Sequence, residues 1–190
     1  MALLAKWKAE GLLNDSAFEK LGLFADLLLQ WNSRINLTGL TSRESVEEIL
    51  ICESILAARA FPLSEKRVLD IGSGAGIPGL VWLTCDPTIH LTSLEIRAKK
   101  VAFQKEACRR LDLKAEIISG RFPYAVRERK FDVIATRAVR FDQTLWTQAS
   151  PLLEPGGSFL RFGASSLEEQ DWHSLPISTR TNLIIRRVES

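Results

Sequence analysis

A run of alternating glycines constrains the fold of this chain more than any other feature. Residues 68–79 begin with Val-Leu-Asp-Ile, place glycine at three alternate positions, and continue through Pro78 into a second apolar run. This order predicts a buried strand, a tight turn and a helix that begins at Pro78, because proline suits the first helical position. Glycine is needed where the backbone has a positive φ or lies directly against a ligand. We therefore expect a cofactor-binding loop at the end of a strand.

The glycines fit two different sequence patterns, and each pattern indicates a different cofactor. G-x-G-x-x-G at positions 74–79, with Glu95 about 20 residues further on, satisfies the dinucleotide fingerprint. Asp70 would repel a pyrophosphate, but it would attract the sulfonium and ammonium groups of S-adenosylmethionine. G-x-G-x-G at positions 72–76 also starts two residues after Asp70, where the strand should break. We favour S-adenosylmethionine over a dinucleotide and over a glycine turn without a ligand, with contacts to Asp70, Gly72, Gly74, Gly76 and Glu95.

Composition narrows the class of protein and of partner. The 190 residues are 46% hydrophobic and 25% charged, which suits one folded domain with a full core. A net charge of +2 permits a nucleic-acid partner without requiring one. The three cysteines are widely spaced and form no Cys/His cluster, so we expect neither disulfides nor a metal site. Without a signal-peptide layout or a long apolar run, the sequence predicts a cytoplasmic protein that does not enter a membrane.

The hydrophobic pattern changes near Pro62 and predicts two parts. Residues 1–61 form an N-terminal helical extension, with candidate caps at Asn14-Asp15-Ser16 and capping boxes at Ser16-x-x-Glu19 and Thr41-x-x-Glu44. Residues 62–190 alternate between strands and helices, which predicts an α/β fold with a mostly parallel, Rossmann-like sheet and helices on both faces. We expect strands at 68–71, 89–95, 115–119, 131–136 and 158–162, a strand or hairpin within 177–188, and helices at 78–84, 98–111, 142–150 and 167–172.

Two segments have alternative interpretations. On helix 98–111 we expect an apolar face that packs on the sheet, and a solvated face of lysines and arginines. The first face consists of Val101, Phe103, Ala107, Cys108 and Leu111. The polar segment 31–40 is either a turn stabilised by asparagine or a loop folded over a pocket, and composition alone favours the turn.

Candidate site residues fall at the carboxyl ends of the predicted strands, where open parallel sheets bind ligands. The two oxygens of Glu95 can accept both ribose hydroxyls of the cofactor, or the side chain can stabilise the start of the next helix. Phe122 and Pro123 can form a wall for the adenine ring, although such a pair more often packs in a core. Ile77 is similarly placed to lie against the cofactor.

The residues that are missing from these strand ends limit which kinds of atom could accept the methyl group. Amine methylation usually uses an Asn- or Asp-Pro-Pro-aromatic turn after the fourth strand, where this chain has Ala-Thr-Arg-Ala at 135–138. Carbon methylation of a pyrimidine usually needs a cysteine, and only Cys52 or Cys85 could serve. The N7 lone pair of guanine needs only correct positioning. Arg137 would then contact a phosphate or guanine O6, or else form a structural ion pair with an acid at the strand ends, Asp70 or Glu95.

With these residues assembled, the chain resembles the bacterial small-subunit ribosomal RNA guanine-N7 methyltransferase family, formerly called glucose-inhibited division protein B. The stretches that carry the resemblance span most of the chain in order. They are Leu-Gln-Trp-Asn at 29–32, Asn-Leu-Thr at 36–38, the glycine loop at 68–79, Leu-Glu at 94–95 with 99–103, Gly-Arg at 120–121, and 131–138.

The resemblance implies a class I S-adenosylmethionine-dependent methyltransferase fold that methylates guanine N7 in small-subunit (16S) ribosomal RNA and releases S-adenosylhomocysteine. It implies small-subunit ribosomal RNA or the 30S particle as the partner, and we expect a monomer without metal. Cofactor contacts then fall on Gly72, Gly74, Ile77, Glu95, Phe122, Pro123 and Arg137, and Asn36 and Arg137 lie nearest the acceptor base.

Three positions depart from the family pattern. Phe122-Pro123 replaces a small residue and Glu, Arg161-Phe162-Gly163 replaces Lys-Gly at the end of the fifth strand, and Cys52-Glu53-Ser54 stands where the family has a histidine and Asp-Ser. Two alternatives therefore stay open. The chain is either a methyltransferase of another acceptor or an S-adenosylmethionine-binding module that does not catalyse.

Overall fold

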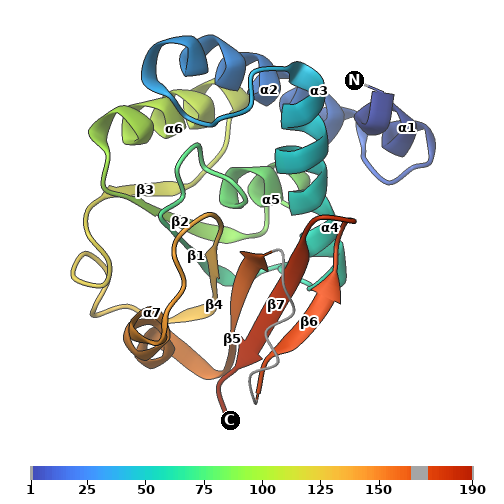
Figure 1. Ribbon diagram of the computed structural model, residues 1–190. Helices are drawn as coiled ribbons and strands as arrows, with labels where there is room; N and C mark the ends of the chain where they lie inside the picture. The colour runs from blue at the N-terminus through green and yellow to red at the C-terminus, as the bar shows by residue number, and fades with distance from the viewer. Residues whose placement is uncertain (1, 164–170, 190) are drawn as a thin grey trace.

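The computed structural model describes residues 2–163 and 171–189, and in these residues a seven-stranded sheet has helices on both faces (Figure 1). The strand order is β3-β2-β1-β4-β5-β7-β6, with β1 to β5 parallel and β7 antiparallel to both of its neighbours. The strands are β1 (Arg67–Ile71), β2 (His90–Glu95), β3 (Glu116–Ser119), β4 (Phe131–Thr136), β5 (Leu153–Gly163), β6 (His173–Pro176) and β7 (Asn182–Arg187).

Helices before β1 are grouped on one side of the sheet together with α5 and α6 (Figure 1). The α-helices are α1 (Ala2–Ala9), α2 (Asp15–Ile35), α3 (Arg43–Ser45), α4 (Glu53–Ala60), α5 (Gly79–Cys85), α6 (Ala98–Leu111) and α7 (Gln143–Ala149). A π-helix, η1 (Val46–Cys52), joins α3 to α4, and a 3-10 turn, η2 (Ser150–Leu152), joins α7 to β5.

Alternation along β1 divides the buried side chains between two cores. Val68 belongs to the core under α2, α4, α5 and α6, whereas Leu69 and Ile71 belong to the core under α7. Because both faces are covered, the central strands are apolar on both sides, as parallel strands usually are. The predicted α/β fold is confirmed.

The N-terminal helices pack directly against α6. The ring of Phe103 lies with its centroid 6.1 Å from that of Phe24 and 5.7 Å from that of Trp31, both on α2. The sequence predicted that Phe103 packs on the sheet; it belongs to the same buried core as Val68 and Leu91 of the sheet, and α2 adds neighbours that the sequence did not predict. On the neighbouring helix, Trp82 donates its indole N–H to the Ser54 carbonyl, at 2.7 Å.

Both predicted capping boxes were wrong in position. The side chain of Asn14, not Ser16, accepts from the Ala17 amide at 2.7 Å, so α2 begins at Asp15. Likewise Ser42, not Thr41, accepts from the Ser45 amide at 3.1 Å. In both cases a neighbouring residue with an equally suitable side-chain oxygen has the extended backbone that a cap requires.

Differences are larger near the C-terminus. β5 begins at Leu153 instead of residue 158, because Glu154 to Gly157 form an irregular bulge within the strand. The strand or hairpin predicted within 177–188 is a hairpin, with its turn at 177–181 and β7 inside the predicted range, while β6 precedes that range. Residues 167–170 of the predicted helix 167–172 lie outside the described residues.

Candidate cofactor-binding site

The three alternate glycines between β1 and α5 all have left-handed backbones. Their φ angles are +64° at Gly72, +58° at Gly74 and +77° at Gly76, whereas Gly79 has no positive φ. A side chain at Gly72 would also clash, because its Cβ would lie 2.6 Å from a methyl carbon of Val139. The strained positions therefore follow the register 72–76 that we favoured, not the dinucleotide register.

Glu95, the last residue of β2, fixes the glycine loop in place. Its Oε2 accepts from the Gly74 amide at 2.9 Å, and its Oε1 accepts from the Arg97 amide at 2.8 Å, just before α6. The Leu94 carbonyl accepts from the Gly72 amide at 2.9 Å. Each carboxylate oxygen can accept a second bond, so Glu95 keeps the capacity to receive hydroxyl groups.

Gln104 is a buried residue of this site that sequence reasoning missed. It is fully buried on α6, accepts from the Ser93 hydroxyl at 2.6 Å, and donates to the Ser73 hydroxyl at 2.8 Å and the Gly74 carbonyl at 2.9 Å. Its amide thus connects α6, β2 and the loop. The signal was present, because an amide side chain inside an otherwise apolar helix face needs buried polar partners.

Asp70 is fully buried behind the loop and lines none of the cavities described below. Its Oδ2 accepts from the Gly79 amide at 3.0 Å, at the start of α5, and its Oδ1 has no hydrogen-bond partner among the described residues. Burial raises the pKa of this carboxyl group to about 7, against the opposing effect of the Gly79 bond. In the structure, Asp70 supports the turn into α5.

Two cavities meet at Gly72 on the carboxyl side of the strands. The first, of about 360 Å³, lies between the ends of β2 and β4 and is lined by Glu95, Ile96, Phe122 and others. Ile96 is 54% exposed directly after Glu95, which gives this cavity an apolar wall that the sequence analysis missed. Phe122 lines the cavity as predicted, whereas Pro123 does not line it.

The second cavity, of about 300 Å³, lies between the glycine loop and the N-terminal segment. Its described lining is Leu37, Thr38, Gly39, Leu50, Gly72, Ser73, Gly74, Ala75, Ile77, Lys100, Arg137 and Ala138. Ile77 and Arg137 are therefore placed together as predicted, while Gly76 and Asn36 do not line the cavity. Lys100 was expected on the solvated face of α6, but it lies at the cavity because it is in the first turn of that helix, next to the loop.

Both interpretations of the segment 31–40 hold in the structure. Asn32 accepts from the amides of Leu37 at 2.7 Å and Thr38 at 2.9 Å, and it donates to the Leu40 carbonyl at 3.1 Å. This asparagine-stabilised turn follows the left-handed cap of α2 at Asn36. It places residues 37–39 on the wall of the second cavity.

Arg137 follows β4 and is held by the N-terminal helices. Its Nη2 donates to Glu53 Oε2 at 2.6 Å and to the Ile49 carbonyl at 2.7 Å, and its guanidinium lies 4.8 Å from the centre of the Phe162 ring. The predicted ion-pair partners were Asp70 and Glu95, but in the structure Arg137 pairs with Glu53 instead. Burial lowers the pKa of Arg137, and the Glu53 carboxylate opposes this effect.

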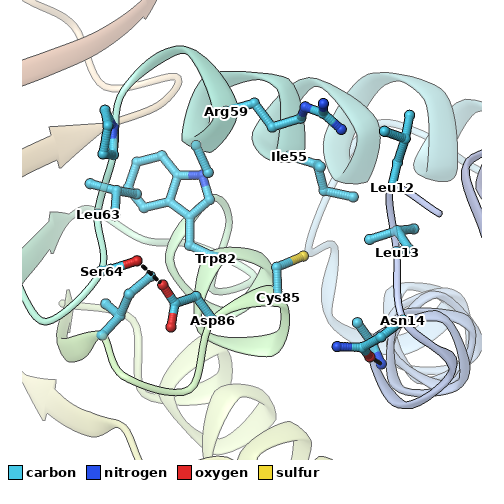
Figure 2. Close-up of a pocket in the computed structure, with 14 residues that line it drawn as sticks. Leu12, Leu13, Asn14, Ile55, Arg59, Leu63, Ser64, Trp82, Cys85 and Asp86 are labelled. Carbon is cyan, nitrogen blue, oxygen red and sulfur yellow. Dashed lines mark hydrogen bonds between the residues drawn. The ribbon is translucent and has the colours of Figure 1, made fainter.

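The cysteines lie away from the two cavities. Burial raises the pKa of Cys52 and of Cys85 to about 12, so neither thiol is ionised near neutral pH. Cys85 lines a third cavity of about 320 Å³ between α2, α4 and α5 (Figure 2). Its other walls are mainly apolar, with Trp82 on one side and Leu12 and Leu13 on the other. This cavity is separate from the glycine loop.

Within 2–163 and 171–189, no group of three or more His, Cys, Asp or Glu side chains could hold a metal ion. No helix in this part of the chain is long and apolar enough to cross a lipid bilayer.

The sequence matches known proteins over most of its length. The family model described as rRNA small subunit methyltransferase G matches residues 17–182. A protein of that name from Wolinella succinogenes is 34% identical over 175 residues, which cover 90% of each chain. A second, from Roseiflexus castenholzii, is 32% identical over 166 residues, which cover 83% of this chain and 70% of the relative.

Solved structures share the fold at low sequence identity. A methyltransferase from Pyrococcus furiosus superposes with a TM-score of 0.63 at 14% identity, over 90% of this chain and 99% of that one. An RNA methyltransferase from Salinibacter ruber, solved in complex with S-adenosyl-L-homocysteine, has a TM-score of 0.60 at 14% identity, over 70% of this chain and 88% of that one. These likenesses establish a methyltransferase fold.

Proposed function

The chain belongs to the rRNA small subunit methyltransferase G family, and on this basis we propose that it transfers a methyl group from S-adenosylmethionine to N7 of a guanine in small-subunit ribosomal RNA. Two features of the site support this proposal. The glycine loop and first cavity suit the cofactor, and the lining of the second cavity suits an acceptor that needs no base.

The residues around the loop fit S-adenosylmethionine. The left-handed glycines leave no side chain between the backbone and a ligand, and the Glu95 oxygens keep free acceptor capacity for ribose hydroxyls. Ile96 and Phe122 offer apolar surfaces for a planar ring. When bound, the cofactor supplies an electrophilic methyl group on its sulfonium. The chain supplies orientation and exclusion of water around that group.

The residues that line the second cavity are the observation that favours guanine N7 as the acceptor. Among its described lining residues there is no Asp, Glu, His or Cys. A reaction at an amine would call for a group that relieves the nitrogen of its proton, and carbon methylation would call for a thiolate. The N7 lone pair of guanine attacks without either. Arg137 can donate to guanine O6 and leave that lone pair free, while Asn36 remains a predicted contact of the base.

The test is methyl transfer from labelled S-adenosylmethionine to small ribosomal subunits and, in parallel, to naked 16S ribosomal RNA, both lacking the modification. We expect label at N7 of one guanine. Label on another base or another RNA would favour the alternative acceptor, and cofactor affinity without transfer would favour a non-catalytic module. Glu95→Gln serves as the binding-deficient control and exposed Arg109→Gln as the matched surface control.

Further features of this proposal concern cellular context. We propose that the protein acts in the cytoplasm as a monomer, on the 30S particle or its RNA. Comparison of the two substrates in the transfer experiment separates recognition of naked RNA from recognition of the assembled particle. Sedimentation of the protein at the assay concentration tests the monomer.

A further inference from the structure

Glu53 is a buried carboxylate at the start of α4 whose two oxygens each have a partner. It is 4% exposed. Its Oε2 accepts from Arg137 Nη2 at 2.6 Å, and its Oε1 accepts from the Ser178 hydroxyl at 2.7 Å. Ser178 lies in the turn between β6 and β7. One glutamate therefore connects α4, the end of β4 and the C-terminal hairpin.

In the guanidinium of Arg137, Nη2 has hydrogen-bond partners and Nη1 has none among the described residues. Its Nη2 donates both to Glu53 and to the Ile49 carbonyl, while its Nη1 is buried and has no hydrogen-bond partner among the described residues. Buried donors are almost always paired in native proteins, so an unpaired one on a residue that lines a cavity points to a partner that binds there. Arg137 lines the second cavity beside the glycine loop.

The pairing also determines which kind of ligand atom this donor suits. An arginine that binds phosphate normally offers two parallel N–H groups and an uncompensated positive charge. The charge of Arg137 is already compensated by Glu53, and its Nη2 is occupied. What remains is the Nη1 group, which cannot form a parallel fork with the occupied Nη2 and has little net charge around it. That donor suits a neutral carbonyl oxygen of a base.

We propose that Glu53 is a positioning residue that holds Arg137 so that its Nη1 donates to a neutral oxygen of the acceptor base, and not to a phosphate. This inference rests on the proposed function and deepens it, because it assigns a residue that selects the base at the methylation site. Glu53 itself does not touch the substrate. Its effect on catalysis passes through Arg137.

The experiment is a double-mutant cycle with Glu53→Gln and Arg137→Gln, measured as kcat and KM for methyl transfer to small ribosomal subunits. Each single variant should lower kcat by about tenfold to a hundredfold, the range typical of a lost charged hydrogen bond. The double variant should be no slower than Arg137→Gln alone. Additive losses would overturn the inference, because Glu53 would then act independently of Arg137.

A matched control is available one helix earlier. Glu47 on η1 is also buried, at 2% exposed, and accepts from Arg43 Nε at 2.7 Å, but it does not line the second cavity. Glu47→Gln should lower the melting temperature without changing kcat. Equal losses of kcat in Glu47→Gln and Glu53→Gln would show a general effect of helix stability, and would reject a positioning role for Glu53.

Inorganic phosphate tests the charge argument directly. With Glu53 replaced by Gln, Arg137 carries an uncompensated charge, so phosphate should inhibit the variant at about tenfold lower concentration than wild type. Unchanged inhibition would overturn the claim of neutralisation. If Glu53→Gln does not fold, Glu53→Asp and Ser178→Ala replace it, and both should lower kcat while cofactor affinity stays within about twofold. If the wild-type protein transfers no methyl group to N7, the proposed function itself is rejected. Failure of the proposed function can therefore be distinguished from failure of the positioning role of Glu53.

Discussion

Asp70 should make the protein less stable as the pH rises towards neutrality. Its pKa is about 7 in the folded protein because the carboxyl group is fully buried, against a usual value of 3.8. The folded state therefore binds this proton more tightly than the unfolded state. By linkage, the free energy of unfolding falls as pH increases between these two values and levels off above the higher one. The full loss corresponds to about 4 kcal/mol, at about 1.4 kcal/mol per pKa unit.

The variant Asp70→Asn removes this titration and keeps an oxygen for the Gly79 amide. Its amide nitrogen would take the place of Oδ1, which lacks a partner among the described residues, so the variant carries its own cost of about 1 to 3 kcal/mol at every pH. The informative quantity is therefore the difference in unfolding free energy between variant and wild type. Between about pH 5 and pH 8 this difference should shift by about 2.5 kcal/mol in favour of the variant.

Urea denaturation at a series of pH values measures this shift. Asp132→Asn is a suitable control, because Arg67 lowers the pKa of Asp132 and moves its titration below the pH range of the assay. Its difference from wild type should stay constant. A difference for Asp70→Asn that is equally constant across the range would refute the reasoning, since it would mean that Asp70 is ionised in the folded protein throughout.

Four further substitutions test other parts of the site and its support. Glu95→Gln should weaken S-adenosylmethionine binding by about tenfold in calorimetry, since it removes the charge that the Gly74 and Arg97 amides contact, and unchanged affinity would contradict that role. Arg137→Ala should lower kcat by at least about tenfold with a smaller change in cofactor affinity, so a loss confined to affinity would argue against it. Asn32→Ala should cost about 1 to 3 kcal/mol of unfolding free energy, because two amides lose their acceptor. Phe103→Ala should cost about 3 to 5 kcal/mol in the same assay. Values near zero for these last two would contradict the packing described.

The positions of the parallel strands and the glycine loop could be predicted because both depend on short-range patterns. Apolar runs that end in Asp70 and Glu95 predict strand ends, and alternate glycines predict left-handed turns. Parallel strands then bring their carboxyl ends to one edge, which places Glu95 beside the loop. These inferences need no knowledge of how the N-terminal helices pack.

The partners of buried polar side chains could not be predicted in this way. Glu53 and Arg137 are 84 positions apart and meet only because α4 packs beside the end of β4. From the sequence, the nearest acids to Arg137 in the predicted sheet were Asp70 and Glu95. Burial also changed the role of Asp70, because a carboxyl group behind the loop is deprived of solvent and supports the turn at Gly79. Neither effect has a local signature.

The second cavity combines parts of the chain that the proposed division at residue 61 would assign to separate units. Residues 37–39 and Leu50 come from the segment before β1, whereas the glycine loop and Arg137 come from the sheet. Glu53 and Ile49 also supply the bonds that fix the Arg137 guanidinium. A sheet without residues 1–61 would keep the glycines and Glu95 but would lose one wall of the second cavity and the anchor of its arginine. The N-terminal helices therefore form part of the proposed acceptor side of the site, whereas the described lining of the first cavity, proposed for the cofactor, comes only from residues between 71 and 148.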